Sequence, residues 1–477
     1  MAAVGDPGIE TSKAVAAPIW SRVPLLTAGL GFVAALAAYY PGMFNPDSIE
    51  QFDQSRSGHF MDWHPPIMAL LWFGLNKIQL GPQLLLILHL MLFWSALCLV
   101  GSGLLRSGSK LGAAAPLAGF LPPVFVLVGV LANDVELVAA WLLAAGLVFE
   151  STARSEAPGI ARKALIVCLF IYGAFVRTNA VFAAPPLVYY GLTEIGWGRQ
   201  RERFLAALVI PVVLLVLSGA FGVTIAKSEH PGASLLIFDI GSTSQRLDAN
   251  LLPGKWSAAD AKLFVHCGHP DSWDAYATRS CAFATQKLQV ADQWGSELLL
   301  GAWLAAIWRH PAVYAEHRLI YSNDFFRWLG RTPVADIDTG SEIEEPAFQH
   351  SGNRLSNAYA AVVQGDHLYL RPYFWLIVSL GGFVAASLAL PSRARRFSLA
   401  LSSSAALYLL GYVVVGVGTD YRYSYWSICA ALCALIALAA CDWRQHRAVL
   451  AVLLFAVILA FGVGASIISS AGAPVIL

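Results

Sequence analysis

The chain has 477 residues, of which 57% are hydrophobic and only 13% are charged, and its mean hydropathy is +0.61. Soluble globular domains carry about 25% charged residues, so this composition excludes an ordinary soluble protein and indicates a polytopic membrane protein. The formal net charge of +1 gives no indication of nucleic-acid binding.

Long apolar runs recur along the chain. A hydrocarbon core of roughly 30 Å needs about 20 apolar residues of helix, and backbone groups inside a bilayer must satisfy their own hydrogen bonds, so these runs are predicted to be helices. The sequence therefore predicts an all-α polytopic fold with about eleven transmembrane helices. The predicted spans are residues 22–40, 83–105, 112–131, 135–150, 164–176, 180–193, 204–225, 373–390, 397–417, 424–440 and 448–468.

The basic residues set the predicted topology. With a cytoplasmic N-terminus, every predicted inside loop carries Lys or Arg, as the positive-inside rule requires. To keep this pattern, residues 65–81 are predicted to form an interfacial helix and residues 298–308 a helix that does not cross. Residues 164–193 must then cross twice, with an outer turn from Arg177 to Asn179.

Three parts are predicted in chain order. An N-terminal transmembrane module, residues 1–225, includes a first outer loop at 41–82. A mostly helical periplasmic domain is inserted at 226–372, where the composition becomes that of a small soluble domain. Transmembrane helices complete the chain at 373–477.

Two of the seven cysteines, Cys267 and Cys281, fall in the inserted segment. A pair at this spacing in an oxidising compartment such as a periplasm predicts a disulfide. The alternative is a metal site, because His266 and His269 flank Cys267. Zinc motifs usually present two spaced pairs of ligands, which favours the disulfide.

Ionisable residues are dense in the first outer loop, which contains Asp47, Glu50, Asp53, Asp62 and His64. A loop that only joined two helices would be far shorter, which favours a functional site. Two structural alternatives stay open. Asp47 and Glu50 fit a helix N-cap with its capping-box partner, and His64, just before Pro65, fits a cap of the interfacial helix.

Charged residues recur at the other predicted outer turns. Asp134 and Glu136 interrupt an apolar hairpin, where a charge at mid-membrane costs about 2.5–3.5 kcal/mol; the alternative is two acids that favour a helix N-terminus. Arg177 and Arg422 are cations on the face that the positive-inside rule depletes, which favours an anionic ligand such as a phosphate. The alternatives are snorkelling of Arg177 and, for Arg422 with Tyr423, an aromatic belt with a local ion pair.

The order of these motifs resembles the GT-C superfamily of integral-membrane glycosyltransferases, and more narrowly its bacterial members with a Pro-Asp-Ser first loop. The shared motifs are an Asp soon after Tyr-Pro-Gly (Asp47), His-Pro-Pro (His64), Asn-Asp after the third span (Asp134), Arg-x-Asn (Arg177 and Asn179) and Asp-x-Arg-Tyr (Asp420, Arg422 and Tyr423). Two departures stand out. Glu50 is three positions from Asp47, whereas paired acids often adjoin in related mannosyltransferases, and either Asp134 or Glu136 matches the second acid.

The resemblance implies transfer of a sugar from a polyprenyl-phosphate donor to an envelope glycan, lipid or protein acceptor, on the periplasmic side of a bacterial inner membrane. A lipid phosphate leaves readily, so the site needs cations rather than a strong acid, and one base deprotonates the acceptor with inversion. Asp47 is expected to be that base and Asp134 the second catalytic carboxylate. The residues expected to bind substrate are Glu50, Asp62, His64, Glu136, Arg177, Asn179, Arg422 and Tyr423. A divalent cation, Mg²⁺ or Mn²⁺, bridging Asp47 and the phosphate is an open alternative that the sequence does not require.

Two other functions share some of these features. A flippase or transporter of lipid-linked oligosaccharides also needs many spans and cations for phosphate. Transporters, however, place polar residues near the bilayer midplane between similar halves, whereas the charges here gather at one predicted surface. An enzyme that adds a non-sugar group to envelope lipids differs only in its donor.

Overall fold

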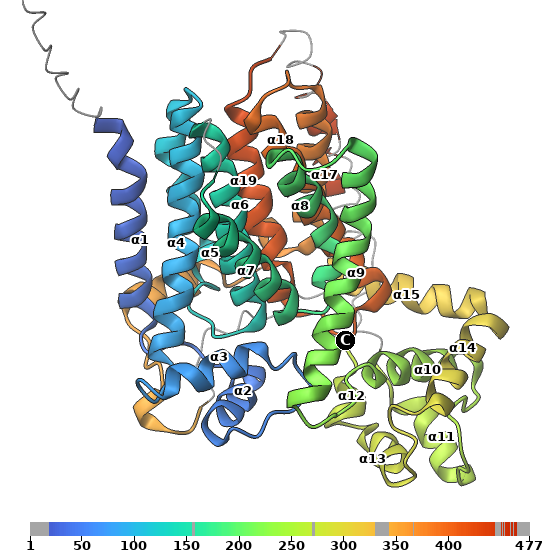
Figure 1. Ribbon diagram of the computed structural model, residues 1–477. Coiled ribbons are helices and arrows are strands. Elements are labelled where there is room, and N and C mark those ends of the chain that lie inside the picture. Colours follow the sequence, from blue (N-terminus) through green and yellow to red (C-terminus); the bar gives the residue numbers. More distant parts are fainter. Residues whose placement is uncertain are drawn as a thin grey trace, which may run out of the picture.

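The computed structural model describes residues 19–154, 158–269, 272–329, 343–365, 367–443 and parts of 450–464. Within these residues the chain forms helices and no β-strand (Figure 1); two isolated bridges pair Met43 with Val130 and Met61 with Lys227. In the same part of the chain, five helices are long and apolar enough to cross a membrane: Gln83–Arg106, Asn133–Arg154, Gln200–Ile225, Arg393–Val415 and Tyr421–Ala439. The predicted all-helical membrane class is therefore confirmed.

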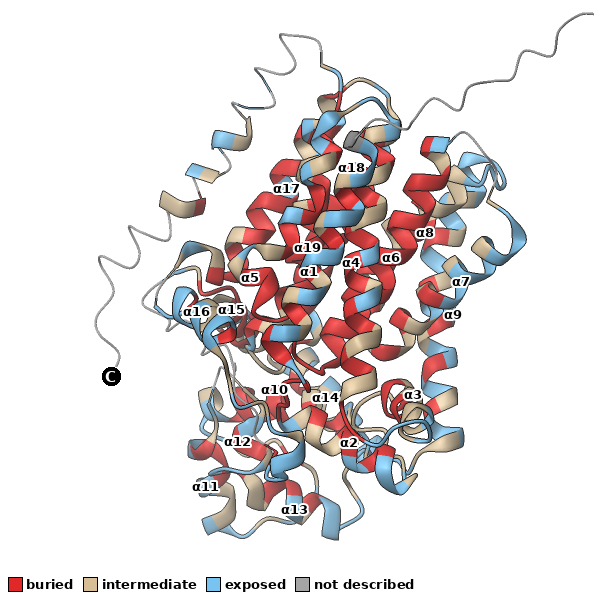
Figure 2. Cartoon of the chain, turned by 90° about the vertical axis from the view of Figure 1, so that its left-hand side faces the viewer, coloured by how far each residue is buried: buried red, intermediate tan, exposed pale blue. Residues whose placement is uncertain are grey.

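A bundle of long helices makes up most of the molecule (Figure 1). Its helices are α1 (Val23–Tyr39), α4 (Gln83–Arg106), α6 (Asn133–Arg154), α7 (Ile160–Val176), α8 (Ala180–Glu194), α9 (Gln200–Ile225), α17 (Pro372–Leu388), α18 (Arg393–Val415) and α19 (Tyr425–Ala439). Helix α6 lies inside the bundle and is almost entirely buried, whereas α9 is mostly exposed or intermediate (Figure 2). Many Leu and Val side chains of α9 are exposed. This pattern is expected if α6 is surrounded by other helices and α9 faces lipid.

Most of the predicted spans up to residue 440 coincide with a helix to within about four residues at each end. Residues 160–194 divide into α7 and α8 at the predicted turn. Only part of the predicted span 448–468 is described, and its described residues are helical. Residues 330–342, which include Asp336 and Asp338, lie outside the described residues.

The predicted span 112–131 is wrong as a single helix. The structure has the 3-10 helix η2 (Lys110–Phe120), the short α5 (Pro122–Phe125) and then turns. Pro116 and the Pro122-Pro123 pair lack the backbone N–H that an α-helix needs. Gly112 also brings η2 so close to α4 that a Cβ here would stand 2.3 Å from the carbonyl oxygen of Gly101.

Two other segments lie at one end of the bundle (Figure 1). The first loop, residues 41–82, folds into α2 (Pro46–Ser57) and α3 (Ile67–Asn76), so the segment predicted as interfacial is a short helix. The described residues of the inserted domain, 226–372, are mostly helical, as predicted. Its elements are α10 (Ala233–Leu247), α11 (Ala258–Cys267), α12 (Asp274–Ala277), α13 (Ala282–Val290), α14 (Glu297–Arg309), α15 (Pro311–Phe326), η3 (Pro346–Phe348), α16 (Arg354–Val362) and η4 (Leu368–Leu370).

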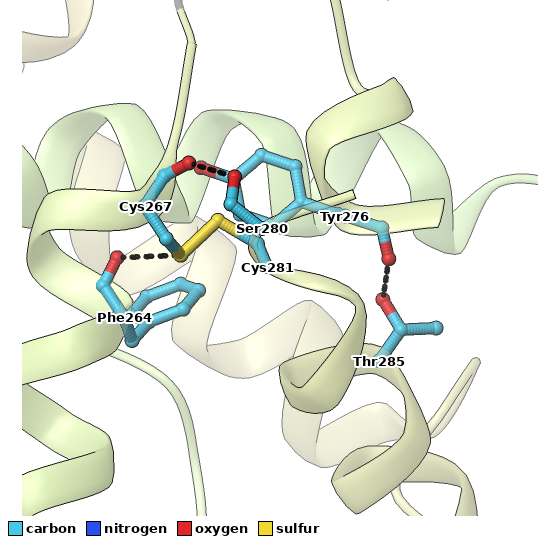
Figure 3. Close-up of a disulfide and its surroundings, with 6 residues drawn as sticks. All are labelled: Phe264, Cys267, Tyr276, Ser280, Cys281 and Thr285. Atoms are coloured by element: carbon cyan, nitrogen blue, oxygen red, sulfur yellow. Dashed lines mark hydrogen bonds between the residues drawn. A yellow bond between two sulfur atoms is a disulfide. The ribbon is translucent and has the colours of Figure 1, made fainter. Parts of the chain in front are cut away.

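A disulfide joins Cys267 and Cys281, the pair that the sequence predicts, with the Cα atoms 5.4 Å apart (Figure 3). Hydrogen bonds support it on both sides: Ser280 Oγ donates to the carbonyl of Cys267 at 2.7 Å, and Thr285 Oγ1 donates to the carbonyl of Tyr276 at 2.7 Å. Because the Cys267 sulfur is bonded to Cys281, the alternative metal site loses its thiolate.

Candidate functional site

The first loop presents Asp47 in the first turn of α2. Asn45 caps this helix: its Oδ1 accepts from the backbone N–H of Ser48 at 2.9 Å, and Ser48 Oγ accepts from the N–H of Asn45 at 2.7 Å. Pro46 follows at the first helical position, which suits its fixed φ. The alternative of a capping box built from Asp47 and Glu50 is therefore wrong, and the Asp47 carboxylate is left free for other partners.

Those partners come from distant parts of the chain. Arg422, in the 3-10 helix η5 (Tyr421–Ser424), donates from Nη2 to Asp47 Oδ2, and His64 Nε2 lies 3.5 Å from Asp47 Oδ1. Helix α3 begins after Pro66 without a side-chain cap, so the alternative role of His64 as its cap is wrong. Burial opposes the charge on Asp47, but Arg422 and His64 outweigh it and hold the pKa of Asp47 well below its usual range.

A second ion pair lies beside the first. Arg177, in the turn between α7 and α8, places Nε 2.9 Å from Asp134 Oδ1 at the start of α6. Among the described residues neither Asp134 oxygen has a hydrogen bond of good geometry, although both are buried. Buried acceptors without hydrogen bonds are uncommon in native structures, which makes Asp134 a candidate for contact with a further group.

Tyr423 lies between the two arginines. The Arg177 guanidinium lies 4.8 Å from its ring centroid and that of Arg422 5.3 Å. Tyr412, near the end of α18, stacks on Tyr423 with ring centroids 5.4 Å apart, and its hydroxyl accepts from Arg177 Nη2 at 3.4 Å. The two aromatic rings thus hold both guanidinium groups in one place.

These residues form one cluster with alternating charge, which we call the site cluster: Asp47, Asp134, Arg177, Asp420 and Arg422. Asp420, 54% exposed, accepts from Arg422 at 3.1 Å, while the two arginine side chains are each only 15% exposed. Three carboxylates thus surround two arginines. An incoming anion can exchange for a carboxylate at an arginine, because the guanidinium groups are already desolvated and oriented.

Polar contacts between backbone and side chains position the cluster. Gln51, one turn after Asp47, donates to Asn133 Oδ1 at 2.6 Å, and Asn133 Nδ2 donates to the carbonyl of Val176 at 2.9 Å, next to Arg177. Met43 pairs with the segment before Asn133, exchanging backbone hydrogen bonds of 2.9 Å with Gly129 and Leu131. Asp47, Asp134 and Arg177 are therefore fixed to one another by their neighbours.

Two of the predicted substrate-binding residues, Glu136 and Asp62, have partners outside the site cluster. Glu136 faces the bundle interior, 3.3 Å from His89 Nδ1, and accepts from the Tyr172 hydroxyl at 3.2 Å. Asp62 accepts from Ser228 Oγ at 2.9 Å and from the N–H of Glu229 at 2.6 Å. These bonds join the first loop to the start of the inserted domain and occupy both oxygens of Asp62.

Glu50 and Asn179 lie at the edge of the site cluster. Glu50 accepts from Gln54 at 3.1 Å, and burial, reinforced by Asp47, raises the pKa of Glu50 despite the opposing effect of His64. Asn179 follows Arg177 at the start of α8, and its buried Oδ1 has no hydrogen-bond partner among the described residues. The predicted sites that the structure brings together are thus Asp47, His64, Asp134, Arg177, Arg422 and Tyr423.

Sequence reasoning missed Gln51 and Tyr412. Gln51 stands four residues after Asp47 and so shares its helix face, and Tyr408 and Tyr412 share one face of α18 in the same way. The four-residue spacing in each pair is the sequence feature that could have identified them. Among the described residues, no group of three or more His, Cys, Asp or Glu is arranged to hold a metal ion.

Comparison of the chain with protein-family models, with curated proteins and with solved structures gave no match. The function of the protein is therefore inferred from the geometry of the site cluster.

Proposed function

We propose that this protein is a membrane glycosyltransferase of the GT-C type, which moves a sugar from a polyprenyl-phosphate donor to an envelope glycan, lipid or protein acceptor. The observation that carries the proposal is the contact between Asp47 and Arg422, 375 residues apart, beside the pair of Asp134 and Arg177. A base, a second carboxylate and two phosphate-binding cations lie within one group of contacts. In this proposal the site faces the periplasm of a bacterial inner membrane.

The charges suggest how the donor would activate the base. While Arg422 is paired with Asp47, the carboxylate has a low pKa and is a weak base. The donor phosphate takes over Arg422 and Arg177, and Asp47 is released. Burial then raises its pKa and its basicity, so that binding and activation occur together.

The transfer itself is a single displacement. Asp47 takes the proton of the acceptor hydroxyl, whose oxygen forms a bond to the anomeric carbon. The bond between that carbon and the phosphate oxygen breaks, and its electron pair leaves with the polyprenyl phosphate, whose charge Arg422 and Arg177 stabilise. Attack opposite the leaving group inverts the anomeric configuration.

The place of the site cluster favours a transferase over a transporter. The cluster is formed by α2, the first turn of α6, the turn after α7 and η5, at the end of the bundle where the first loop and the inserted domain lie (Figure 1). Transporters bind substrate near the midplane on broken helices. A transferase that acts on membrane-anchored substrates at one surface needs the arrangement seen here.

The direct test uses proteoliposomes with undecaprenyl-phosphate-linked hexose, pentose and aminosugar, each radiolabelled, and an envelope extract as acceptor. We expect the wild-type protein to transfer one of these sugars to extract components. The corresponding cells should show envelope glycans or glycolipids heavier by that sugar than cells without the protein. Absence of transfer from all three donors together with unchanged envelope masses would disprove the proposal.

A further inference from the structure

The turn that leads into Arg422 is held by the inserted domain through its backbone. Four successive carbonyl groups, those of residues 416–419, accept hydrogen bonds from that domain. The donors are Arg318 Nη1 to Gly416 at 2.7 Å, the N–H of Trp273 to Val417 at 2.8 Å, the Tyr321 hydroxyl to Gly418 at 2.8 Å and Arg327 Nη2 to Thr419 at 2.8 Å. We call these residues the 416–419 turn. A turn with four consecutive carbonyls bound has little freedom left in its peptide planes.

The donors are themselves fixed inside the domain. Asp239 of α10 is buried and accepts from Trp303 at 2.7 Å and from His317 at 2.9 Å, and it lies 2.6 Å from Arg318 Nη2. Arg327 is 2% exposed and also donates to the carbonyl of Leu370 at 3.2 Å. Burying an arginine is costly unless its guanidinium group is paired or hydrogen-bonded. Both Arg318 and Arg327 are buried, and both donate hydrogen bonds to the 416–419 turn.

The domain also contacts the other side of the site cluster. The ring of Trp273 packs against that of Trp63 with centroids 4.9 Å apart, and Trp63 directly precedes His64 in the first loop. Trp273 therefore contacts the first loop with its ring and the 416–419 turn with its backbone N–H. The inserted domain joins the two segments that carry Asp47 and Arg422.

We propose that the inserted domain positions Arg422 against Asp47 by binding the 416–419 turn, with Arg318, Tyr321 and Arg327 as positioning residues. This role rests on the proposed function, in which Arg422 holds the donor phosphate. It gives the domain a task in the reaction besides any contact with the acceptor. Loss of a single hydrogen bond to this turn is then expected to weaken the ion pair between Asp47 and Arg422.

Tyr321→Phe is the sharpest variant, because it removes one hydroxyl donor and keeps the buried ring. Arg327→Lys keeps the charge but loses the fork that reaches two carbonyls. The matched control is Tyr276→Phe, a buried tyrosine of the same domain whose hydroxyl has no hydrogen-bond partner among the described residues. All three variants keep the size and the apolar packing of the side chain nearly intact.

The first readout needs no substrate. A double-mutant cycle between Asp47→Asn and Arg422→Gln, measured as thermal unfolding midpoints of the full-length protein, reports the coupling of these two residues. We expect this coupling to fall by at least half in the Tyr321→Phe and Arg327→Lys backgrounds and to stay unchanged in Tyr276→Phe. Unchanged coupling in both positioning variants would overturn the inference, whatever the transfer assay gives.

The second readout is kinetic. With an undecaprenyl-phosphate sugar, the KM for donor should rise about 3- to 10-fold in Tyr321→Phe and Arg327→Lys, with kcat changed less. The acid limb of kcat/KM should move to higher pH, a shift that general destabilisation does not produce. If the coupling falls in the two positioning variants while the wild-type protein transfers no sugar, the positioning role stands and the proposed function alone is disproved.

Discussion

Helix α6 carries a carboxylate bound by arginine near each of its ends, and the two surroundings differ. Near the C-terminal end, the buried Glu150 is bound by Arg106, Arg154 and Arg162, whose side chains are 46%, 41% and 26% exposed. We call these residues the Glu150 cluster. At the N-terminal end, Asp134 belongs to the site cluster, where two arginines that are each 15% exposed face three carboxylates.

The difference separates an ion cluster in contact with solvent from a buried one in this fold. The Glu150 cluster has more cations than anions, its arginines come from neighbouring helix ends and their charges remain in contact with solvent, as basic residues at a membrane face are expected to be. The site cluster buries its arginines, draws them from the turn after α7 and from the distant η5, and leaves acceptors on Asp134 without hydrogen bonds. Buried charges are costly, and their enrichment at functional sites is the reason for choosing the site cluster rather than the Glu150 cluster as the candidate site.

The largest effect should follow the loss of the proposed base. Asp47→Asn keeps the size of the side chain but removes proton acceptance, so kcat for sugar transfer should fall about 10²- to 10⁴-fold. Asp53→Asn, an exposed acid on the same helix, is the matched control and should leave kcat within about twofold. Full turnover by Asp47→Asn would remove Asp47 from the role of base.

A smaller effect is expected at the phosphate site. Arg422→Lys keeps the positive charge but cannot bind two oxygens with a planar fork, so the KM for the lipid donor should rise about 10- to 100-fold. Arg162→Lys makes the same change in the Glu150 cluster and should leave donor KM unaltered. Equal effects of the two substitutions on KM would break the distinction between the clusters.

The pH dependence of stability shows whether Asp47 is paired with Arg422. The folded-state pKa of Asp47 lies below its unfolded value of about 4, so its contribution to stability is present above that pH and is lost only as the pH falls through the lowered folded pKa. The difference in unfolding midpoint between the wild type and Asp47→Asn should therefore stay constant from about pH 8 to 5.

The same measurement in an Arg422→Gln background should no longer give a constant difference. Without Arg422, burial raises the pKa of Asp47, and the contribution of Asp47 to the free energy of unfolding then falls as the pH rises from about 4 to the raised pKa. A flat profile in both backgrounds would show that Arg422 is not what keeps Asp47 charged.

The smallest effect on transfer is expected at the Glu150 cluster. Glu150→Gln leaves three arginines with solvent contact, so the free energy of unfolding should fall by about 1–2 kcal/mol while kcat and KM stay within about twofold. Thermal unfolding and the transfer assay together check this. Loss of transfer in a stably folded Glu150→Gln protein would show that the two ends of α6 act together.

Much of the helix order could be predicted, because apolar length and the placement of bases constrain it strongly. The turn at Arg177 is an example. Residues 164–193 must cross the membrane twice if all the basic loops are to lie on one side, so a turn is required between the two crossings. Residues 112–131 could not be read from apolar length alone, because Pro116 and Gly112 shape that segment through packing against α4.

The site was predictable in its charged members and less so in their partners. Asp134 and Glu136 are two residues apart, which is about 200° around a helix, so only one of them can face the site cluster, and the sequence does not give the phase of α6. Asp62 was equally ambiguous, because its partners Ser228 and Glu229 lie far along the chain. Long-range polar pairing has no local signal in one sequence.

The separation of 375 residues between Asp47 and Arg422 also has a consequence for biogenesis. At a translation rate of about 5–20 residues per second, the ribosome needs roughly 20–75 s to reach the arginine after it has made the aspartate. During that interval the nascent protein carries its acidic loop without the cation that neutralises it. The ion pair therefore forms only late in synthesis, and a chain cut short before η5 cannot form it.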